Sequence, residues 1–150
     1  IMNIAFAIFE LCIIIVLFHA HLIVPQQPLL FIVFFINGVL ISFFINLMLS
    51  FLGFWTPEIW APRFLFTMLV FFVSGSYFPL NLLPSPIYHA LLITPFPYLF
   101  YLPAQTLTGH IDSNLLIIQL GASFAWVFLL YVLSKKMWNL GNKSFSFFGR

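Results

Sequence analysis

Long apolar stretches, separated by short polar or proline-containing breaks, dominate the hydrophobic pattern of this 150-residue chain. One of them, "LLFIVFFINGVLISFFINLMLS", is apolar on every side of a helix and lacks the alternation of a barrel strand. A helix needs about 20 such residues to cross the hydrocarbon core of a bilayer. The stretches that reach this length are residues 2–24, 29–53, 63–82 and 114–134. The pattern predicts an all-α integral membrane protein with four transmembrane helices, forming a single transmembrane domain over 1–150.

The stretch "YFPLNLLPSPIYHALLITPFPYLFYLPAQTLTG" is almost wholly apolar, but it holds six of the ten prolines. Its two sub-runs, "IYHALLI" and "PYLFYLPAQTL", are too short to span, and Pro95 and Pro97 divide them. Irregular backbone exposed to lipid would leave its N–H and C=O groups unpaired. Residues 83–113 are therefore predicted to form two short helices, a proline-broken re-entrant or interfacial hairpin between the third and fourth spans. Such hairpins are typical of transporters and channels.

Composition and charge agree with a membrane location. The chain is 63% hydrophobic and 5% charged, whereas a soluble domain carries roughly 25% charged residues. The Lys and Arg residues all lie in the 54–63 loop or beyond the fourth span: Arg63, Lys135, Lys136, Lys143 and Arg150. By the positive-inside rule, that side is the cytoplasm and 83–113 is outside. We expect a multi-pass protein of the cell (plasma) membrane with a cytoplasmic tail at 135–150.

Several chemistries find no support in the sequence. A net charge of +2 is too small and dispersed to suggest nucleic acid. A single cysteine, Cys12, excludes an internal disulfide and a cysteine-based metal cluster. There is no GxxxxGK[ST] loop for ATP hydrolysis. We predict no catalytic residue, no metal site and no cofactor in this chain.

Polar residues inside the predicted spans are candidates for a substrate path. Glu10 would cost about 2.5–3.5 kcal/mol at a helix centre, so its carboxyl group should face protein or water. It could handle protons or substrate, or hydrogen-bond to a neighbouring helix. In the second span Asn37, Ser42 and Asn46 either line an aqueous path or bond helix to helix. Both interpretations remain open for each residue.

The order of motifs from residue 53 onward resembles the membrane subunit of type-2 ABC exporters, in particular the daunorubicin-resistance-like six-helix permeases. The motifs are "GFWT" at a helix end, "SGSYFPLNLLP", "TPFPYLFYLPAQTLTG", and a short tail with Trp138 and Gly149. The resemblance is weak over the first 50 residues. Since that family has six spans and four are predicted here, the first two helices of the family are expected to be missing.

The resemblance implies a permease subunit that forms the translocation path, pairs with a second permease copy and couples to a separate cytoplasmic ATPase. ATP and magnesium would bind to that ATPase. The resemblance also implies an outer re-entrant cap that includes Ser74, Gly75, Pro79, Pro84, Pro95, Pro97, Pro103 and Gly109. The loop residues Thr56, Glu58 and Arg63 would contact the ATPase. Alternatively, this loop is an ordinary interfacial turn anchored by tryptophans.

Two other functions are compatible with the sequence. The first is a secondary transporter or channel in which Glu10 is the coupling carboxylate. The second is a membrane-embedded enzyme acting on lipid through His89, His110 and Asp112 at the outer surface.

Overall fold

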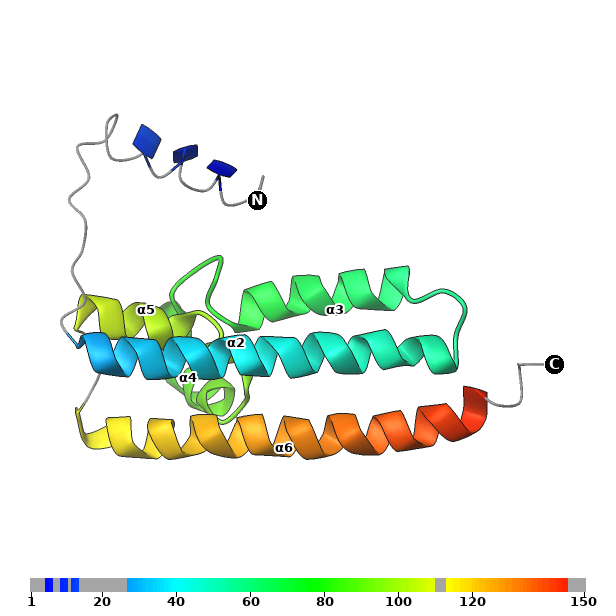
Figure 1. Cartoon of the computed structure of the whole chain (residues 1–150). Helices are drawn as coiled ribbons and strands as arrows, with labels where there is room; N and C mark the ends of the chain where they lie inside the picture. Colours follow the sequence, from blue (N-terminus) through cyan, green and yellow to red (C-terminus); the bar gives the residue numbers. More distant parts are fainter. Residues whose placement is uncertain (1–4, 7–8, 11, 14–26, 110–112, 146–150) are drawn as a thin grey trace.

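The computed structural model describes residues 5–6, 9–10, 12–13, 27–109 and 113–145, and the regular structure in these residues is helical. Figure 1 shows the arrangement. The α-helices are α2 (Pro28–Phe51), α3 (Trp60–Val73), α4 (Ser85–Leu92), α5 (Tyr101–Thr108) and α6 (Ser113–Phe145). Three short 3₁₀ helices connect them: η1 (Leu52–Phe54), η2 (Leu80–Leu82) and η3 (Phe96–Tyr98).

Helices α2 and α6 form the long axis of the molecule and run side by side in the same direction (Figure 1). The stretches Pro28–Phe54 and Leu115–Lys143 are long and apolar enough to cross a bilayer, judged by length and composition. Phe34 and Ile41 of α2 and Leu130 of α6 are buried and belong to the same apolar core. Many of their other large apolar side chains are exposed, as expected where lipid covers the helices.

Helix α3 differs from the prediction of one helix over 63–82. It begins at Trp60, ends at Val73, and none of its residues is buried. Its 14 residues rise about 21 Å, less than the roughly 30 Å of a bilayer core. The chain turns at Gly75, whose φ is +80°, so the apolar residues that follow cannot continue the helix. The predicted span 2–24 lies mostly outside the described residues, and the count of four spans stays a prediction.

Helix α6 is longer than predicted, because it continues from the expected span into the expected tail and ends at Phe145. Residues 135–145 contain no proline, and they retain a face that packs on the end of α2. Trp138 lies 5.5 Å from Phe51 and 5.7 Å from Phe54, measured between ring centroids. Packing of this face extends the helix beyond the apolar segment.

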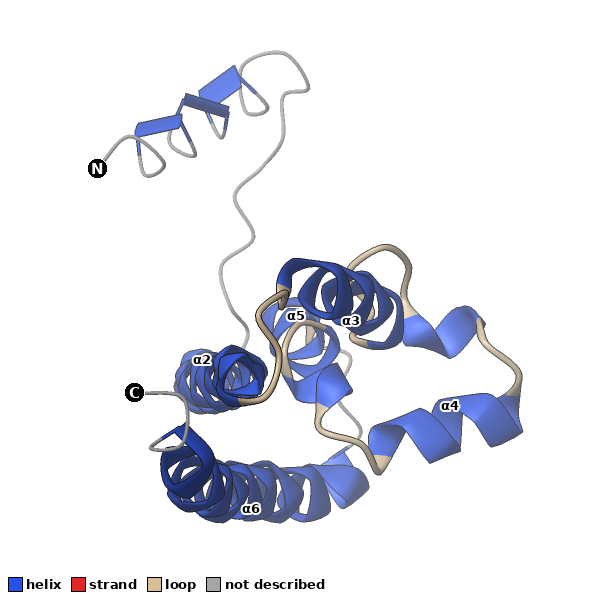
Figure 2. Ribbon diagram, turned by 90° about the vertical axis from the view of Figure 1, so that its right-hand side faces the viewer, coloured by secondary structure: helices blue, strands red, loops and turns tan. Residues whose placement is uncertain are grey.

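The proline-rich connection forms two short α-helices, as predicted. Helices α4 and α5 are separated by η3, which contains Pro97. In the view of Figure 2, α2 and α6 point toward the viewer, and α4 lies to the side of α6 with its axis turned crosswise to theirs. Helix α5 ends at Gly109, a left-handed residue with φ +71°. The depth of these helices in a membrane stays a prediction.

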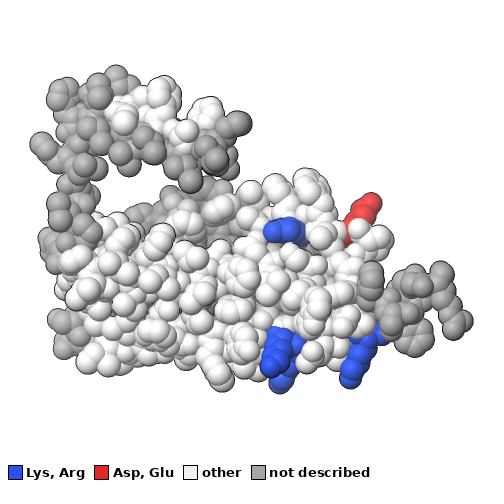
Figure 3. Space-filling view, in the orientation of Figure 1, with Lys and Arg blue, Asp and Glu red and all other residues white. Residues whose placement is uncertain are grey.

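Apart from Glu10, the described charged residues gather in one half of the molecule. Figure 3 shows Lys, Arg and an acidic residue toward the end where α2 stops and α3 begins. They are Glu58, Arg63, Lys135, Lys136 and Lys143. Helices α4 and α5 lie toward the other end (Figure 1), and 83–109 contains no Lys, Arg, Asp or Glu. The two ends of the bundle therefore differ in charge as well as in backbone structure.

Candidate functional site

Asn37 joins α2 to α6 through a buried hydrogen bond. Its Nδ2 donates to Ser123 Oγ at 2.9 Å, and both side chains are buried. The Ser123 hydroxyl in turn donates to Leu120 O at 2.7 Å. In this structure the Asn37 amide bonds helix to helix, while its part in a substrate path stays a prediction.

The neighbouring residue, Gly38, holds η3 against α2. A methyl group added at Gly38 would lie 2.6 Å from the backbone oxygen of Tyr98, too close for any side chain. The backbone of η3 therefore reaches the surface of α2 only because position 38 has no Cβ. Two consecutive residues of α2 thus contact two different neighbours.

Ser42 and Asn46 lie on another part of α2, where they line a cavity of about 260 Å³ together with α3 residues such as Thr67. Asn46 Nδ2 donates to Ser42 O at 2.9 Å, and Asn46 Oδ1 accepts from Arg63 Nη2 at 3.3 Å. Asn46, a predicted residue of the substrate path, is therefore hydrogen-bonded to Arg63, a predicted residue of the ATPase contact. Asn37 does not take part in this contact, because it bonds to Ser123 of α6.

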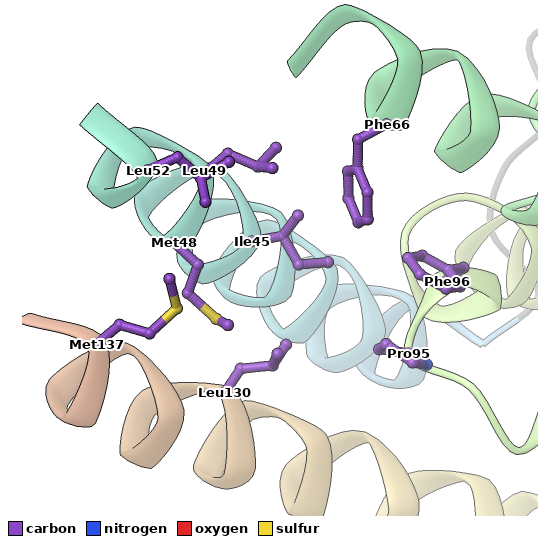
Figure 4. A pocket seen from close by; sticks show the side chains of 9 residues that line it. All are labelled: Ile45, Met48, Leu49, Leu52, Phe66, Pro95, Phe96, Leu130 and Met137. Atoms are coloured by element: carbon purple, nitrogen blue, oxygen red, sulfur yellow. The ribbon is translucent and has the colours of Figure 1, made fainter. Parts of the chain in front are cut away.

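A second cavity, of about 240 Å³, lies between α2, α3, η3 and α6 and is lined by apolar side chains (Figure 4). The lining residues are Ile45, Met48, Leu49, Leu52, Phe66, Pro95, Phe96, Leu130 and Met137. It shares Ile45, Leu49 and Phe66 with the cavity at Asn46. The two cavities are therefore neighbours, and Ser42, Asn46 and Thr67 add polar groups to the lining of the first one only.

The predicted cap is attached through its backbone at the Ser74–Gly75 turn. Ser74 is fully buried, and its carbonyl oxygen accepts a hydrogen bond from Tyr101 N at 3.1 Å. At Gly75 a Cβ would lie 3.1 Å from both Leu80 Cγ and Tyr101 Cβ. The turn that ends α3 therefore also fixes the start of α5.

The prolines of the cap mark where short helices begin. Pro79, Pro84 and Pro95 occupy the positions just before η2, α4 and η3. Pro97 and Pro103 lie in the first turns of η3 and α5. The N–H groups of a first turn have no intrahelical partner, so proline removes no hydrogen bond there. These residues direct the chain as well as interrupt it.

A group of uncharged polar side chains in the cap was not singled out by the sequence analysis. Gln105 Nε2 donates to Tyr101 Oη at 2.6 Å, and Tyr101 Oη donates to Tyr88 Oη at 3.4 Å. Burial, and then the hydrogen bond to Tyr88, raise the pKa of the Tyr101 phenol, so it stays protonated and neutral. The spacing of Tyr101 and Gln105, four residues apart in a helix, is the one signal that the sequence offers.

This polar group borders a hollow in the cap with two adjoining parts of about 360 and 300 Å³. Both parts are lined by Asn81, Tyr101 and Gln105. The second part also reaches Gln119 of α6, whose buried Oε1 has no hydrogen-bond partner among the described residues. The hollow is therefore a concave, uncharged site with an unsatisfied acceptor.

Comparison with known protein families gives a match over almost the whole chain. A model of the family described as ABC-2 family transporter protein matches residues 2–149. The chain belongs to the ABC-2 transporter family. It is a membrane permease component of an ABC transporter, and the match includes the first 50 residues, where the resemblance by sequence is weak. No curated protein and no solved structure matches it.

The loop that would meet an ATPase in this ABC-2 permease lies between η1 and α3. Thr56 Oγ1 donates to Leu52 O at 3.3 Å, and Glu58 is exposed. Trp55 and Trp60 are also exposed, as interfacial anchors would be. ATPase contact and interfacial anchoring both remain open for this loop.

The residues of the other two functions are only partly described. Glu10 is exposed. His89 is exposed and its Nδ1 lies 2.7 Å from Ser85 O, whereas His110 and Asp112 lie outside the described residues. No group of three metal-ligating side chains occurs within the part of the permease that the structure describes.

Proposed function

We propose that this chain is the membrane-spanning permease subunit of an ATP-driven ABC exporter. The family match over residues 2–149 carries the proposal. The chain would form the translocation path, pair with a second permease copy, and couple to a separate cytoplasmic ATPase that binds ATP and magnesium. It would lie in the plasma membrane with its C-terminus in the cytoplasm.

The distribution of charge supports this orientation. The described Lys and Arg residues lie toward the end of the bundle formed by the 54–63 loop and the last turns of α6. By the positive-inside rule, that end would lie in the cytoplasm, within reach of an ATPase. The cap would then cover the outer end.

The contact between Arg63 and Asn46 suggests how the loop would act on the path. Arg63 is in the first turn of α3, and its guanidinium group donates to Asn46, which lies near the C-terminal end of α2. Movement of the loop by an ATPase would shift Arg63, and with it the polar wall of the cavity at Asn46. Thr56, Glu58 and Arg63 are our candidates for this coupling segment.

The decisive experiment is to express the permease with its neighbouring genes, solubilise it gently and identify what copurifies. We expect a stoichiometric soluble protein with a Walker A loop, whose ATPase activity depends on the complex. Replacing the Walker A lysine of that partner should abolish ATP-dependent transport in liposomes without dissociating the complex. A partner-free permease that moves a proton or solute would contradict the proposal.

In that case the alternative is a secondary transporter or channel that uses Glu10. Glu10→Gln should then abolish coupled transport, whereas Glu58→Gln, the matched control in the 54–63 loop, should leave it unchanged. If export is instead driven by ATP, Glu10→Gln should not abolish it.

A further inference from the structure

The uncharged hollow in the cap has the features of a ligand site. Its two parts, of about 360 and 300 Å³, fall at the lower end of the size range of small-molecule pockets. Helices α4, α5 and α6 and the segment from Gly75 to Ser85 all contribute to its walls. The walls thus combine residues from distant parts of the chain.

The lining contains hydroxyl, phenol and amide groups but no charge among the described residues. The polar members are Asn81, Ser85, Tyr88, Tyr101, Gln105, Thr108 and Gln119. An ionic ligand would lose its hydration here without gaining a counter-charge, which is unfavourable in a partly buried site. The walls therefore favour a neutral ligand.

The pattern of donors and acceptors narrows the ligand further. Gln119 Oε1 is covered and unpaired in this structure, so the side chain would have to turn toward the hollow to accept a hydrogen bond from a ligand. The Gln105 amide uses Nε2 to reach Tyr101, which leaves its carbonyl oxygen as an acceptor. The exposed Asn81 amide offers both donors and an acceptor. Hydroxyl groups both donate and accept, so several of them on one ligand would match this arrangement.

The aromatic rings add an apolar surface beside these groups. Tyr88 and Tyr101 both line the hollow, and their ring centroids are 6.1 Å apart with an interplanar angle of 80°. One side of a sugar ring, which presents C–H groups, could pack on such a wall while its hydroxyl groups face the amides. A water molecule alone would use only the polar groups.

We propose that this hollow binds an uncharged polyhydroxylated group, the chemistry of a sugar or polyol. The group could belong to a soluble saccharide or to the headgroup of a neutral glycolipid. Binding at the hollow does not require the ATP-driven export proposed above, and it can be measured on the permease alone.

The test uses the full chain in nanodiscs prepared without glycoside detergents, with maltose as the soluble probe and saturation-transfer NMR as the readout. We expect maltose to bind and glucose 6-phosphate to bind at least tenfold more weakly. Nanodiscs with and without a neutral glycosyl diacylglycerol separate the sources. If the glycolipid competes with maltose or binds in its place, the headgroup is the ligand, and binding of maltose alone indicates a soluble saccharide.

Variants locate the site. Gln119→Leu should weaken binding about tenfold, because one hydrogen bond is lost and a donor of the ligand is left unpaired. Tyr88→Phe, which removes a single oxygen atom, should weaken it less and guards against a folding defect in the first variant. Thr94→Val is the matched control in the cap, since Thr94 bonds to Leu91 O and lines neither part of the hollow.

Absence of binding to both maltose and the glycolipid overturns the proposal, and it would leave water as the partner of Gln119. If glucose 6-phosphate binds as tightly as maltose, the proposal that the ligand is uncharged is wrong. Equal loss in Thr94→Val and Gln119→Leu, at unchanged melting temperature, overturns the location. None of these results bears on whether an ATPase copurifies.

Discussion

The α6 helix and the cap both pack on α2, but they do so by different means. The α2–α6 interface is made by side chains, with an Asn37–Ser123 hydrogen bond among apolar residues. The cap also packs side chains on α3, such as Phe96 on Phe66, but in addition it meets α2 and α3 through its backbone, at Gly38 and at the Ser74–Gly75 turn. Side chains can adopt other rotamers when a neighbour changes, whereas a backbone segment moves only as a whole. We therefore expect substitutions at the cap contacts to be the more damaging.

The largest effect is expected for Gly38→Ala. Its methyl group would meet the Tyr98 carbonyl oxygen at 2.6 Å, and η3 would have to leave α2. We expect a loss of about 3 kcal/mol, the upper end for overpacking, in the free energy of unfolding measured by SDS titration in mixed micelles. Gly121→Ala, whose new methyl group would meet nothing within 4 Å, is the control. Similar losses for both variants would mean that the Gly38–Tyr98 contact does not hold the cap.

Gly75→Ala should come next. The residue has φ +80°, and a left-handed backbone costs roughly 1–2 kcal/mol for residues with a Cβ. We expect a loss of that size and faster hydrogen exchange of the Tyr101 amide, which donates to Ser74 O. Gly53→Ala is the control, because its nearest neighbour would be 4.0 Å away. Unchanged exchange at Tyr101 would show that the turn does not fix α5.

A smaller effect is expected for Gly141→Ala at the other end of the bundle. The new methyl group would collide with the ring of Phe54, but a side chain can move away where a backbone cannot. We expect a loss of about 1 kcal/mol, the lower end for overpacking. Phe54→Leu in the same chain should reduce the penalty, and a double-mutant cycle measures this coupling. A coupling of zero would mean that α6 does not pack here on η1.

The smallest effect is expected for the α2–α6 hydrogen bond. A double-mutant cycle of Asn37→Leu and Ser123→Ala should give a coupling energy of about 0.6 kcal/mol, as is typical between membrane helices. A second measurement of the same variants, transport in liposomes, separates packing from a path role. If Asn37→Leu keeps its stability but abolishes transport, the residue belongs to the substrate path.

The prolines and glycines show how far local chemistry predicts structure. Pro95 and Pro97 separate two short helices, as expected, because proline restricts its own φ and the conformation of the preceding residue. The prediction placed the end of α3 too late, because residues 74–82 carry no charge and include Phe78, Leu80 and Leu82. The left-handed Gly75 and its contact with Tyr101 end the helix, and hydropathy carries no information about either.

The candidate site was predictable only as a set of residue types. Asn37, Ser42 and Asn46 stand out as polar residues in an apolar helix, but the sequence gives them a common role. The structure turns Asn37 toward Ser123 and Asn46 toward Arg63. The sequence did not predict the hollow in the cap. Its lining residues Tyr88, Tyr101, Gln105 and Gln119 are far apart in the sequence or form no motif, and only the folded chain brings them together.

By itself, the sequence determined the membrane location, the spanning-length apolar segments, the short helices of the cap and the family. These properties depend on hydropathy, chain length and the restricted backbone of proline, which act within one segment. The tertiary structure decided where α3 and α6 end, which neighbour each polar side chain of α2 contacts, and that Gln119 faces the cap. Those outcomes depend on how closely segments that are distant in the sequence can approach one another. At Gly38 and Gly75 the absence of a side chain allows the close approach of the cap to α2 and to the end of α3.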